Sequence, residues 1–271
     1  MNIGQVQTLV AEEARTRMAY LITLAPIREK AENLREVCRL FQALAICKLI
    51  AEADVRLFRE HLTRSAQARR YYLRKSRDEN NLDDRFLGIS RVQSVFDAMV
   101  AGDISLARQI VSLSVHEWHG NWEYEDDFCY YLFVHRLIED IAFVDSSEAT
   151  GLIARFERAL EGQRSPRLAL LKALKQRDAS EFLEVFEAFL QDYRESNERK
   201  RVKITEYTAE AIFWPGSFVC IEALAWLRFA TARGIEPTDD FVYCPADIRQ
   251  PYPPLAVPDL FDSLDEALEQ G

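Results

Sequence analysis

The fold is decided by residues 26–53, PIREKAENLREVCRLFQALAICKLIAEA, where apolar side chains recur at helical spacing. The spacing i, i+3, i+7, which marks one face of an α-helix, is carried by Leu34, Val37 and Phe41, and Leu44 continues it. A proline at the start of such a segment suits the first turn of a helix, where a backbone N–H has no intrahelical partner to lose. The segment therefore predicts a long amphipathic helix that buries one face.

Few residues interrupt helices elsewhere in the chain. The 271 residues include only nine glycines and nine prolines, and seven of the prolines lie after residue 214. Long stretches rich in Ala, Leu, Glu, Arg and Lys favour helices over short strands. The sequence therefore predicts an all-α fold in a single domain, residues 1–271, with about ten to twelve helices stacked as helical hairpins in an α-solenoid-like arrangement. The predicted helices cover residues 6–24, 26–53, 54–76, 82–100, 104–113, 126–143, 147–160, 165–174, 178–190, 204–213, 217–234 and 258–268.

Some of these helices carry start and stop signals. Gly102 suits the left-handed position after a helix, and Asp103 suits the N-cap of the next one. Asp178 stands at a similar junction, and Ser165 followed by Pro166 is a strong helix start. These signals predict tight connections between successive helices.

The C-terminal region, residues 235–271, differs in composition from the rest. It holds nine acidic residues and one basic residue, a net charge of −8, which leaves only −2 of the total of −10 for the residues before it. Its prolines exclude a continuous helix, so we expect an acidic extension that lies extended along the domain. Such a charge distribution disfavours nucleic acid and anionic membranes as partners and favours a basic protein surface.

The chain carries signs of an intracellular protein. Residues 1–17 include Glu12 and Glu13 and lack a basic region followed by an apolar run, so we expect no secretory signal. No later window offers some twenty uncharged apolar residues, so we expect no membrane-spanning helix. Five widely spaced cysteines suit reduced core thiols better than a disulfide framework. The sequence therefore predicts a cytoplasmic protein.

Residues 116–127, HEWHGNWEYEDD, form the richest cluster of potential metal ligands. His116 and His119, three apart, could share a helix face with nearby carboxylates, which is one way to build a metal-dependent enzyme. Gly120 interrupts the segment, however, and the spacing is not that of HExxH. The favoured interpretation is an acidic helix start, in which carboxylates face the positive end of the helix dipole.

A basic stretch, residues 69–77 (RRYYLRKSR), interleaves arginines with tyrosines as nucleic-acid surfaces do. Acidic residues follow it at once, beginning with Asp78 and Glu79. We therefore expect internal ion pairing there and no nucleic-acid partner.

Motifs for covalent or phosphoryl chemistry are missing from the chain. It has no GxSxG, no glycine-rich phosphate loop and no Walker lysine. The sequence therefore predicts a protein that is not an enzyme and has no cofactor.

Three stretches together resemble a known family. They are residues 121–127 (NWEYEDD), residues 177–182 (RDASEF), and the ending 221–234 (IEALAWLRFATARG) followed by Tyr243-Cys244-Pro245. They are similar to the bacterial immunity proteins grouped as immunity protein 49. This resemblance implies an all-helical fold, a gene beside that of a polymorphic toxin, and a protein that binds and neutralises this sibling toxin. It carries over no functional residue.

We expect the toxin-binding face to be acidic, because many toxins that act on nucleic acids have basic active-site clefts. The acidic C-terminal region is one candidate for this face, and an exposed tryptophan would supply an aromatic anchor. A helical-repeat adaptor for another protein is the alternative, since it would use the same scaffold. The predicted partner-binding residues are Trp118, Trp122, Glu123, Glu125, Asp126, Asp127, Asp239 and Asp240.

Overall fold

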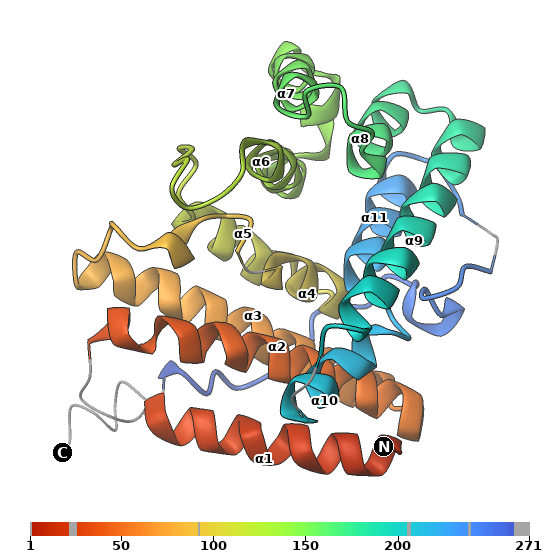
Figure 1. The fold of residues 1–271 in the computed structure, drawn as a ribbon. Coiled ribbons are helices and arrows are strands. Elements are labelled where there is room, and N and C mark those ends of the chain that lie inside the picture. Colours follow the sequence, from red (N-terminus) through yellow and green to blue (C-terminus); the bar gives the residue numbers. More distant parts are fainter. Residues whose placement is uncertain (1, 22–25, 92, 205–206, 238–239, 263–271) are drawn as a thin grey trace.

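Three long helices form the base of the molecule: α1 (Ile3–Leu21), α2 (Ile27–Glu52) and α3 (Val55–Asp78). They lie side by side, each running antiparallel to the one before it (Figure 1). The predicted helix over residues 26–53 is α2, and it packs between the other two helices.

The computed structural model describes residues 2–21, 26–91, 93–204, 207–237 and 240–262. These residues contain eleven α-helices, three short 3₁₀ helices and no strand longer than a single bridge. The predicted all-α fold is confirmed.

The next four helices build outward from α3. They are α4 (Ser94–Ala101), α5 (Ile104–Leu113), α6 (Glu125–Glu139) and α7 (Ser147–Ala159), and α4 and α5 both pack on α3. Helix α6 bridges α5 and α7, so this part of the chain continues the stack of hairpins.

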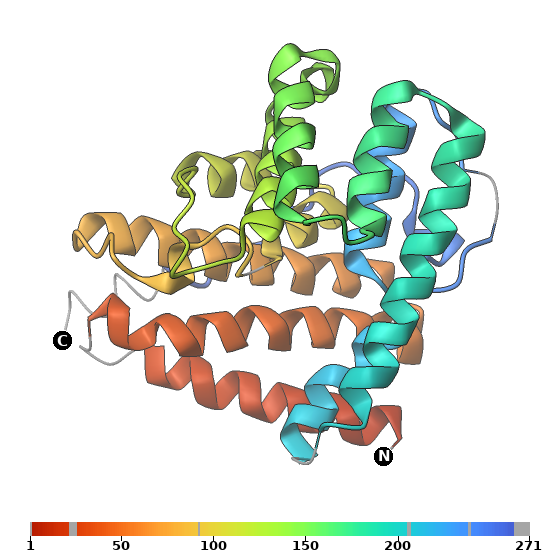
Figure 2. The same ribbon diagram turned by 45° about the horizontal axis from the view of Figure 1, so that its top comes forward.

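The last four helices close the stack on itself. They are α8 (Pro166–Gln176), α9 (Ala179–Arg201), α10 (Tyr207–Gly216) and α11 (Ile221–Ala232). Helix α9 runs back across the molecule to α10, which packs on α1 and α2, while α11 packs on α4 (Figure 2). The hairpin stack is therefore closed, whereas an open solenoid would leave its ends apart.

Capping side chains begin helices where the sequence predicts them. Gly102 adopts φ +86°, the left-handed conformation that ends α4. In each predicted cap the side-chain oxygen accepts a hydrogen bond from the backbone N–H three residues on. These bonds run from Leu106 to Asp103 (2.9 Å), from Leu168 to Ser165 (3.4 Å) and from Glu181 to Asp178 (3.0 Å).

The predicted helix over residues 82–100 is wrong in its first half. That half contains only a 3₁₀ helix, η1 (Arg85–Leu87), and α4 begins after it. The buried guanidinium of Arg69, from α3, donates to the carbonyl oxygens of Phe86 (2.6 Å) and Gly88 (3.3 Å). Because these carbonyls face Arg69, they do not bond to the N–H four residues on, as an α-helix requires.

One stretch of the described residues, Glu210–Ala232, is long and apolar enough to cross a membrane by length and composition alone. It consists of α10 and α11, and most of its apolar window is buried inside the protein. Trp226, near its end, is fully buried in the hydrophobic core. Burial of this kind is also found in core helices of soluble proteins. The five cysteines are buried free thiols, as the sequence predicts.

Residues 245–262, which we call the C-terminal strap, lie along α3. The strap has one short 3₁₀ helix, η3 (Ala246–Ile248), and otherwise irregular backbone. Arg59 of α3 lies over the ring of Tyr252 (4.7 Å) and donates to a strap carbonyl. Farther along, the rings of Tyr71 and Phe261 are 5.5 Å apart, and Phe261 is fully buried. The predicted last helix, residues 258–268, falls largely outside the described residues.

The basic stretch of α3 is paired internally, as the sequence predicts, but with different acids. Arg70 pairs with Asp259 of the strap, and Arg74 pairs with Asp262 (3.0 Å). The acids that follow the stretch directly were the expected partners. Asp259 and Asp262 therefore lie against α3, which leaves them less available to a partner protein.

We expect Phe261→Ala to lower the free energy of unfolding by about 3–5 kcal/mol, because it leaves a cavity between the strap and α3. Chemical denaturation measures the change. Val242→Ala, at an exposed side chain, is the control and should change the free energy by less than about 0.5 kcal/mol. A loss below about 1 kcal/mol for Phe261→Ala would show that the strap does not pack tightly in solution.

Arg228→Met tests a second stabilising contact, in which an arginine of one helix caps the C-terminal end of another. The Arg228 guanidinium, on α11, donates to the carbonyls of Met99 and Val100 at the end of α4, and burial lowers its pKa to about 10. Met keeps the length of the side chain but removes both hydrogen bonds. The Met99 carbonyl keeps the N–H of Gly102 (3.0 Å), whereas the Val100 carbonyl loses its donor, so we expect a loss of about 1–3 kcal/mol in denaturation. Arg199→Met, on the exposed side of α9, is the control. Equal stability of both variants would contradict a stabilising role of this contact.

Candidate partner-binding surface

The loop between α5 and α6, residues 114–124, projects beside α6 (Figure 1). A tight turn inside it is closed by a hydrogen bond from the N–H of Trp122 to the carbonyl of His119 (2.8 Å). The two rings of these residues stack with their centroids 3.9 Å apart. Only 7% of Trp122 is exposed, so its ring anchors the loop to the core.

Glu123 is a second internal anchor of this loop. It is 6% exposed, and its carboxylate accepts a hydrogen bond from the N–H of Ser90 (2.8 Å). The carboxylate also lies so close to Gly88 that a Cβ there would approach it to 3.3 Å. Trp122 and Glu123 are among the predicted partner-binding residues, but both side chains are turned inward and fix the loop, so they offer little surface to a partner.

Two other aromatic side chains of the loop face solvent. Trp118 is 42% exposed and Tyr124 is 79% exposed. The indole N–H of Trp118 donates to the carbonyl of Glu123 (3.2 Å), which fixes its ring, and the Arg155 guanidinium lies over that ring at 5.9 Å. Exposed, fixed aromatic rings beside an arginine have the composition of binding hot spots.

We call the surface formed by Trp118, Tyr124, Glu125, Arg155 and Arg158 the corner patch. Glu125 and Arg155 form an ion pair (2.8 Å) across it, from α6 to α7. A hollow of about 380 Å³ is lined partly by Glu125, Arg155 and Arg158, and Arg155 also lies over the ring of Trp118. The patch therefore combines apolar rings, charges of both signs and a hollow.

The acids at the start of α6 do not form one acidic face. Glu125 pairs with Arg155, and Asp127 pairs with Arg167 (3.1 Å). Burial raises the pKa of Asp127, and the nearby Arg167 lowers it. Asp126 instead lines a cleft between α2 and the helices α8, α9 and α10. Two arginines thus compensate most of the charge that the sequence suggests for this tract.

The remaining predicted acids lie after α11. Asp239 lies outside the described residues. The side chain of Asp240 is 99% exposed and is 3.3 Å from Arg249. Its role in binding stays a prediction.

The histidines do not converge on a metal site. The Nε2 of His116 lies 3.2 Å from the Nδ1 of His135, whereas His119 stacks on Trp122. Burial lowers the pKa of His135 to about 3, so this ring is neutral. Among the described residues, no group of three His, Cys, Asp or Glu side chains has metal-binding geometry. The alternative of an enzyme that uses His116 and His119 therefore lacks its ligand set in this part of the chain.

A buried charge network that the sequence analysis missed joins three helices. The Arg167 guanidinium donates to Glu222 through Nε (2.9 Å) and Nη2 (3.0 Å) and lies 4.5 Å from the ring centre of Tyr130. The hydroxyl of Tyr130 donates to Glu222 (2.6 Å) and accepts from the indole N–H of Trp226 (2.6 Å). The network fixes the starts of α8 and α11 against α6.

The sequence did contain a signal for this network. Glu222 and Arg228 are the charged residues inside the otherwise apolar run of α11. A charged residue on a helix that is buried all round needs a partner, so each of the two indicates a specific contact.

A cleft of about 660 Å³ opens between α2 on one side and α8, α9 and α10 on the other. Arg167 and Glu222 of the network line it, together with Lys200 of α9 and Asp126 of α6. Its volume is within the range of ligand-binding sites, and it is open to solvent along one side. The cleft is a second surface that could receive part of a partner.

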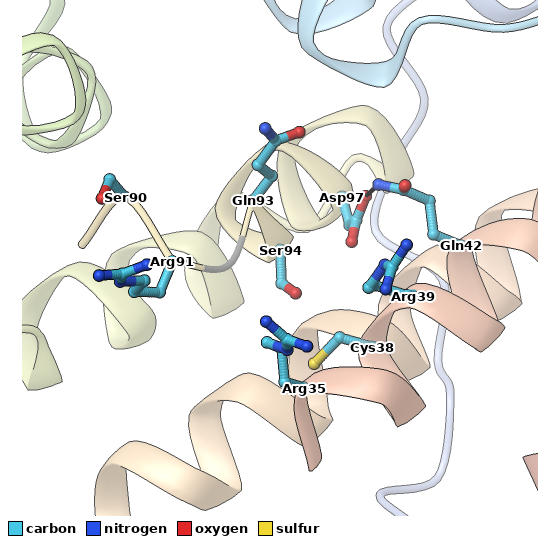
Figure 3. Close-up of a pocket in the computed structure, with 9 residues that line it drawn as sticks. All are labelled: Arg35, Cys38, Arg39, Gln42, Ser90, Arg91, Gln93, Ser94 and Asp97. Carbon is cyan, nitrogen blue, oxygen red and sulfur yellow. Dashed lines mark hydrogen bonds between the residues drawn. The ribbon is translucent and has the colours of Figure 1, made fainter. Parts of the chain in front are cut away.

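A smaller pocket of about 220 Å³ adjoins the cleft, and the two share Arg39, Gln42 and Gln93 (Figure 3). Its floor holds Asp97, which is 1% exposed and accepts hydrogen bonds from Gln42 (2.7 Å) and Ser65 (2.5 Å). Burial raises the pKa of Asp97 to about 7, although both hydrogen bonds lower it. We call this hollow the arginine pocket, because Arg35, Arg39 and Arg91 line it.

Asp97→Asn should remove one source of pH dependence from the stability. Because its pKa is raised, folded Asp97 keeps a proton that the unfolded chain releases. The resulting stabilisation is complete below about pH 4 and is lost as the pH rises to about 7. We expect the free-energy difference between wild type and variant to change by roughly 1.4 kcal/mol per pH unit within that window. Urea denaturation at several pH values measures it.

Asn keeps the shape of the side chain, and Ser65 can accept a hydrogen bond from the new amide. Asp83→Asn, at an exposed carboxyl, is the matched control and should track wild type at every pH. If the difference in free energy of unfolding between wild type and Asp97→Asn stays constant with pH, the Asp97 carboxyl is ionised in the folded protein throughout that pH window.

Comparison with known proteins gives one match. The model of the family described as immunity protein 49 matches residues 84–248, more than half of the chain, and includes the projecting loop, Arg167 and Glu222. A search of curated proteins finds no match, and a search of solved structures also finds none. The match agrees with the resemblance of the three stretches in the sequence. The chain belongs to the immunity protein 49 family.

Proposed function

We propose that this protein binds the toxin encoded beside its own gene and neutralises it by occluding the active site. The observation that supports the proposal is membership of an immunity protein family. Occlusion needs an interface of about 1,600 Å² or more on a scaffold that keeps its shape. The closed helical stack, with one hydrophobic core from Val6 to Phe261, is such a scaffold. We place this activity in the cytoplasm of the toxin-producing bacterium.

We propose the corner patch as the main contact. Of the predicted residues it keeps Trp118 and Glu125, and it adds Tyr124, the aromatic residue with the largest exposed fraction on the described surface. Apolar rings held in place lose little conformational entropy on binding, which is why such residues dominate interface energies. Asp126, Asp127 and Asp240 lie outside the corner patch and remain candidate contacts.

An adaptor for a different protein would share the scaffold and the exposed rings. It differs in the partner, because an adaptor need not bind the neighbouring toxin or protect against it. Co-expression in a sensitive bacterium separates the two functions. Growth restored by a complex with the toxin supports immunity, whereas growth restored without a complex, or no rescue of a toxic neighbour, contradicts occlusion.

Trp118→Ala combined with Tyr124→Ala should weaken binding of a catalytically inactive form of that toxin by about 100-fold or more, since hot-spot residues each contribute about 2 kcal/mol. Calorimetric titration measures the dissociation constant. Val242→Ala with Leu82→Ala, a double truncation at exposed apolar residues elsewhere, is the control and should bind like wild type. Wild-type affinity of the Trp118/Tyr124 variant would remove the corner patch from the interface.

A further inference from the structure

Three arginines line the arginine pocket. Arg35 and Arg39, one turn apart on α2, point toward Ser94 and Asp97, while Arg91 lies at the rim, on the segment before α4, with its guanidinium directed away from the other two (Figure 3). Among the nine residues that line the pocket, Asp97 is the single acid, and it is buried in the floor. The opening is therefore lined by donors, although the chain as a whole is acidic.

The arginines of α2 are held from behind and keep donors free. Glu36 accepts from Arg35 (3.1 Å) and from the Nη1 of Arg39 (2.9 Å), and Glu32 accepts from the same Arg35 nitrogen as Glu36 does. The Nε of Arg35 is buried and has no hydrogen-bond partner among the described residues. Arg91 forms no ion pair within the described part of the chain. The Arg35 Nε and the charge of Arg91 are thus not paired within the described part of the chain.

The net charge of this group suits a single negative charge. Three arginines and the two glutamates that pair with Arg35 and Arg39 carry a net charge of +1, without the buried Asp97. A carboxylate would neutralise this charge, whereas a dianionic phosphate would leave an excess negative charge beside the Asp97 carboxyl. Arginine N–H groups in pairs also match the two oxygens of a carboxylate.

The size of the pocket suits a side chain. Its volume of about 220 Å³ lies below the roughly 300–1,000 Å³ of small-molecule sites. It opens into the cleft of about 660 Å³, with which it shares Arg39 and Gln42. A polypeptide segment in the cleft could therefore place one side chain in the pocket.

We propose that the arginine pocket receives an aspartate or glutamate side chain of the toxin, from a segment that lies in the adjoining cleft. This inference rests on the proposed function and adds the chemistry of one contact. It also reverses the sign of the expected contact, because here the toxin supplies the acid and the immunity protein the base. Arg39 would contact the segment from both the pocket and the cleft, since it lines both.

The test is the affinity of purified full-length variants for a catalytically inactive form of the neighbouring toxin. Arg91→Glu introduces a negative charge without breaking an internal ion pair of the described chain, and Arg39→Gln removes a charge with little change in shape. We expect the dissociation constant to rise at least about tenfold for each variant, as for the loss of a desolvated charge pair. Arg56→Glu, at a side chain on α3 that is 72% exposed and outside the pocket, is the matched control and should bind like wild type.

A second arm identifies the acid on the toxin. Each acidic surface residue of the toxin is replaced by Lys in turn. One of these toxin variants should bind the wild-type immunity protein more weakly than the unaltered toxin does, and should bind the Arg91→Glu variant more tightly than the unaltered toxin does. If wild type binds the toxin and both pocket variants bind it with the same dissociation constant as wild type, the pocket proposal is overturned and the proposed function stands. If wild type itself does not bind the toxin, the proposed function fails, and the pocket proposal fails with it.

Discussion

The carbonyl groups at the C-terminal ends of the helices impose the constraint on which this structure depends. The last carbonyls of a helix have no intrahelical partner, and a closed stack of short helices buries many of them. Here long basic side chains of neighbouring helices donate to them. Arg59 donates to Ala101 (2.9 Å) and Arg228 to Val100 (2.8 Å), so two different helices fix the end of α4. The same contact occurs at other ends, from Lys30 to Leu21, Arg108 to Ile138, Arg77 to Ser112 and Lys175 to Val144.

Local ion pairs explain why the acidic charge balance of the sequence does not produce one acidic face on the described surface. The arginines that donate to neutral carbonyls are not available to acids. Acids then pair with the arginines that remain near the surface, as Glu125 does with Arg155 and Asp259 with Arg70. The acidity of the chain is thus divided among local pairs on several elements.

The sequence predicted the helices well where local chemistry decides the backbone, and less well where another element does. Asp103 and Asp178 cap helices through bonds to residues three positions on, and such local bonds can be recognised in a sequence. The 3₁₀ turn η1 depends on Arg69, which is far away in the chain, so residues 82–93 look helical in isolation. Likewise, Trp122 and Glu123 lie in an irregular loop without a periodic pattern that would show which side chains turn inward.

Two scales of electrostatics meet in the proposed interface. At separations beyond the Debye length of about 8 Å at physiological salt, a partner senses mainly the net charge of −10, which attracts basic proteins. In contact, the partner interacts with individual charged groups. Those at the opening of the arginine pocket are positive, whereas the corner patch carries both positive and negative charges. A basic partner that approaches through the first effect is selected by the second only if it presents a carboxylate at the correct position. On the proposed function, a general attraction of basic proteins and the specific binding of one toxin would therefore be compatible on the same surface.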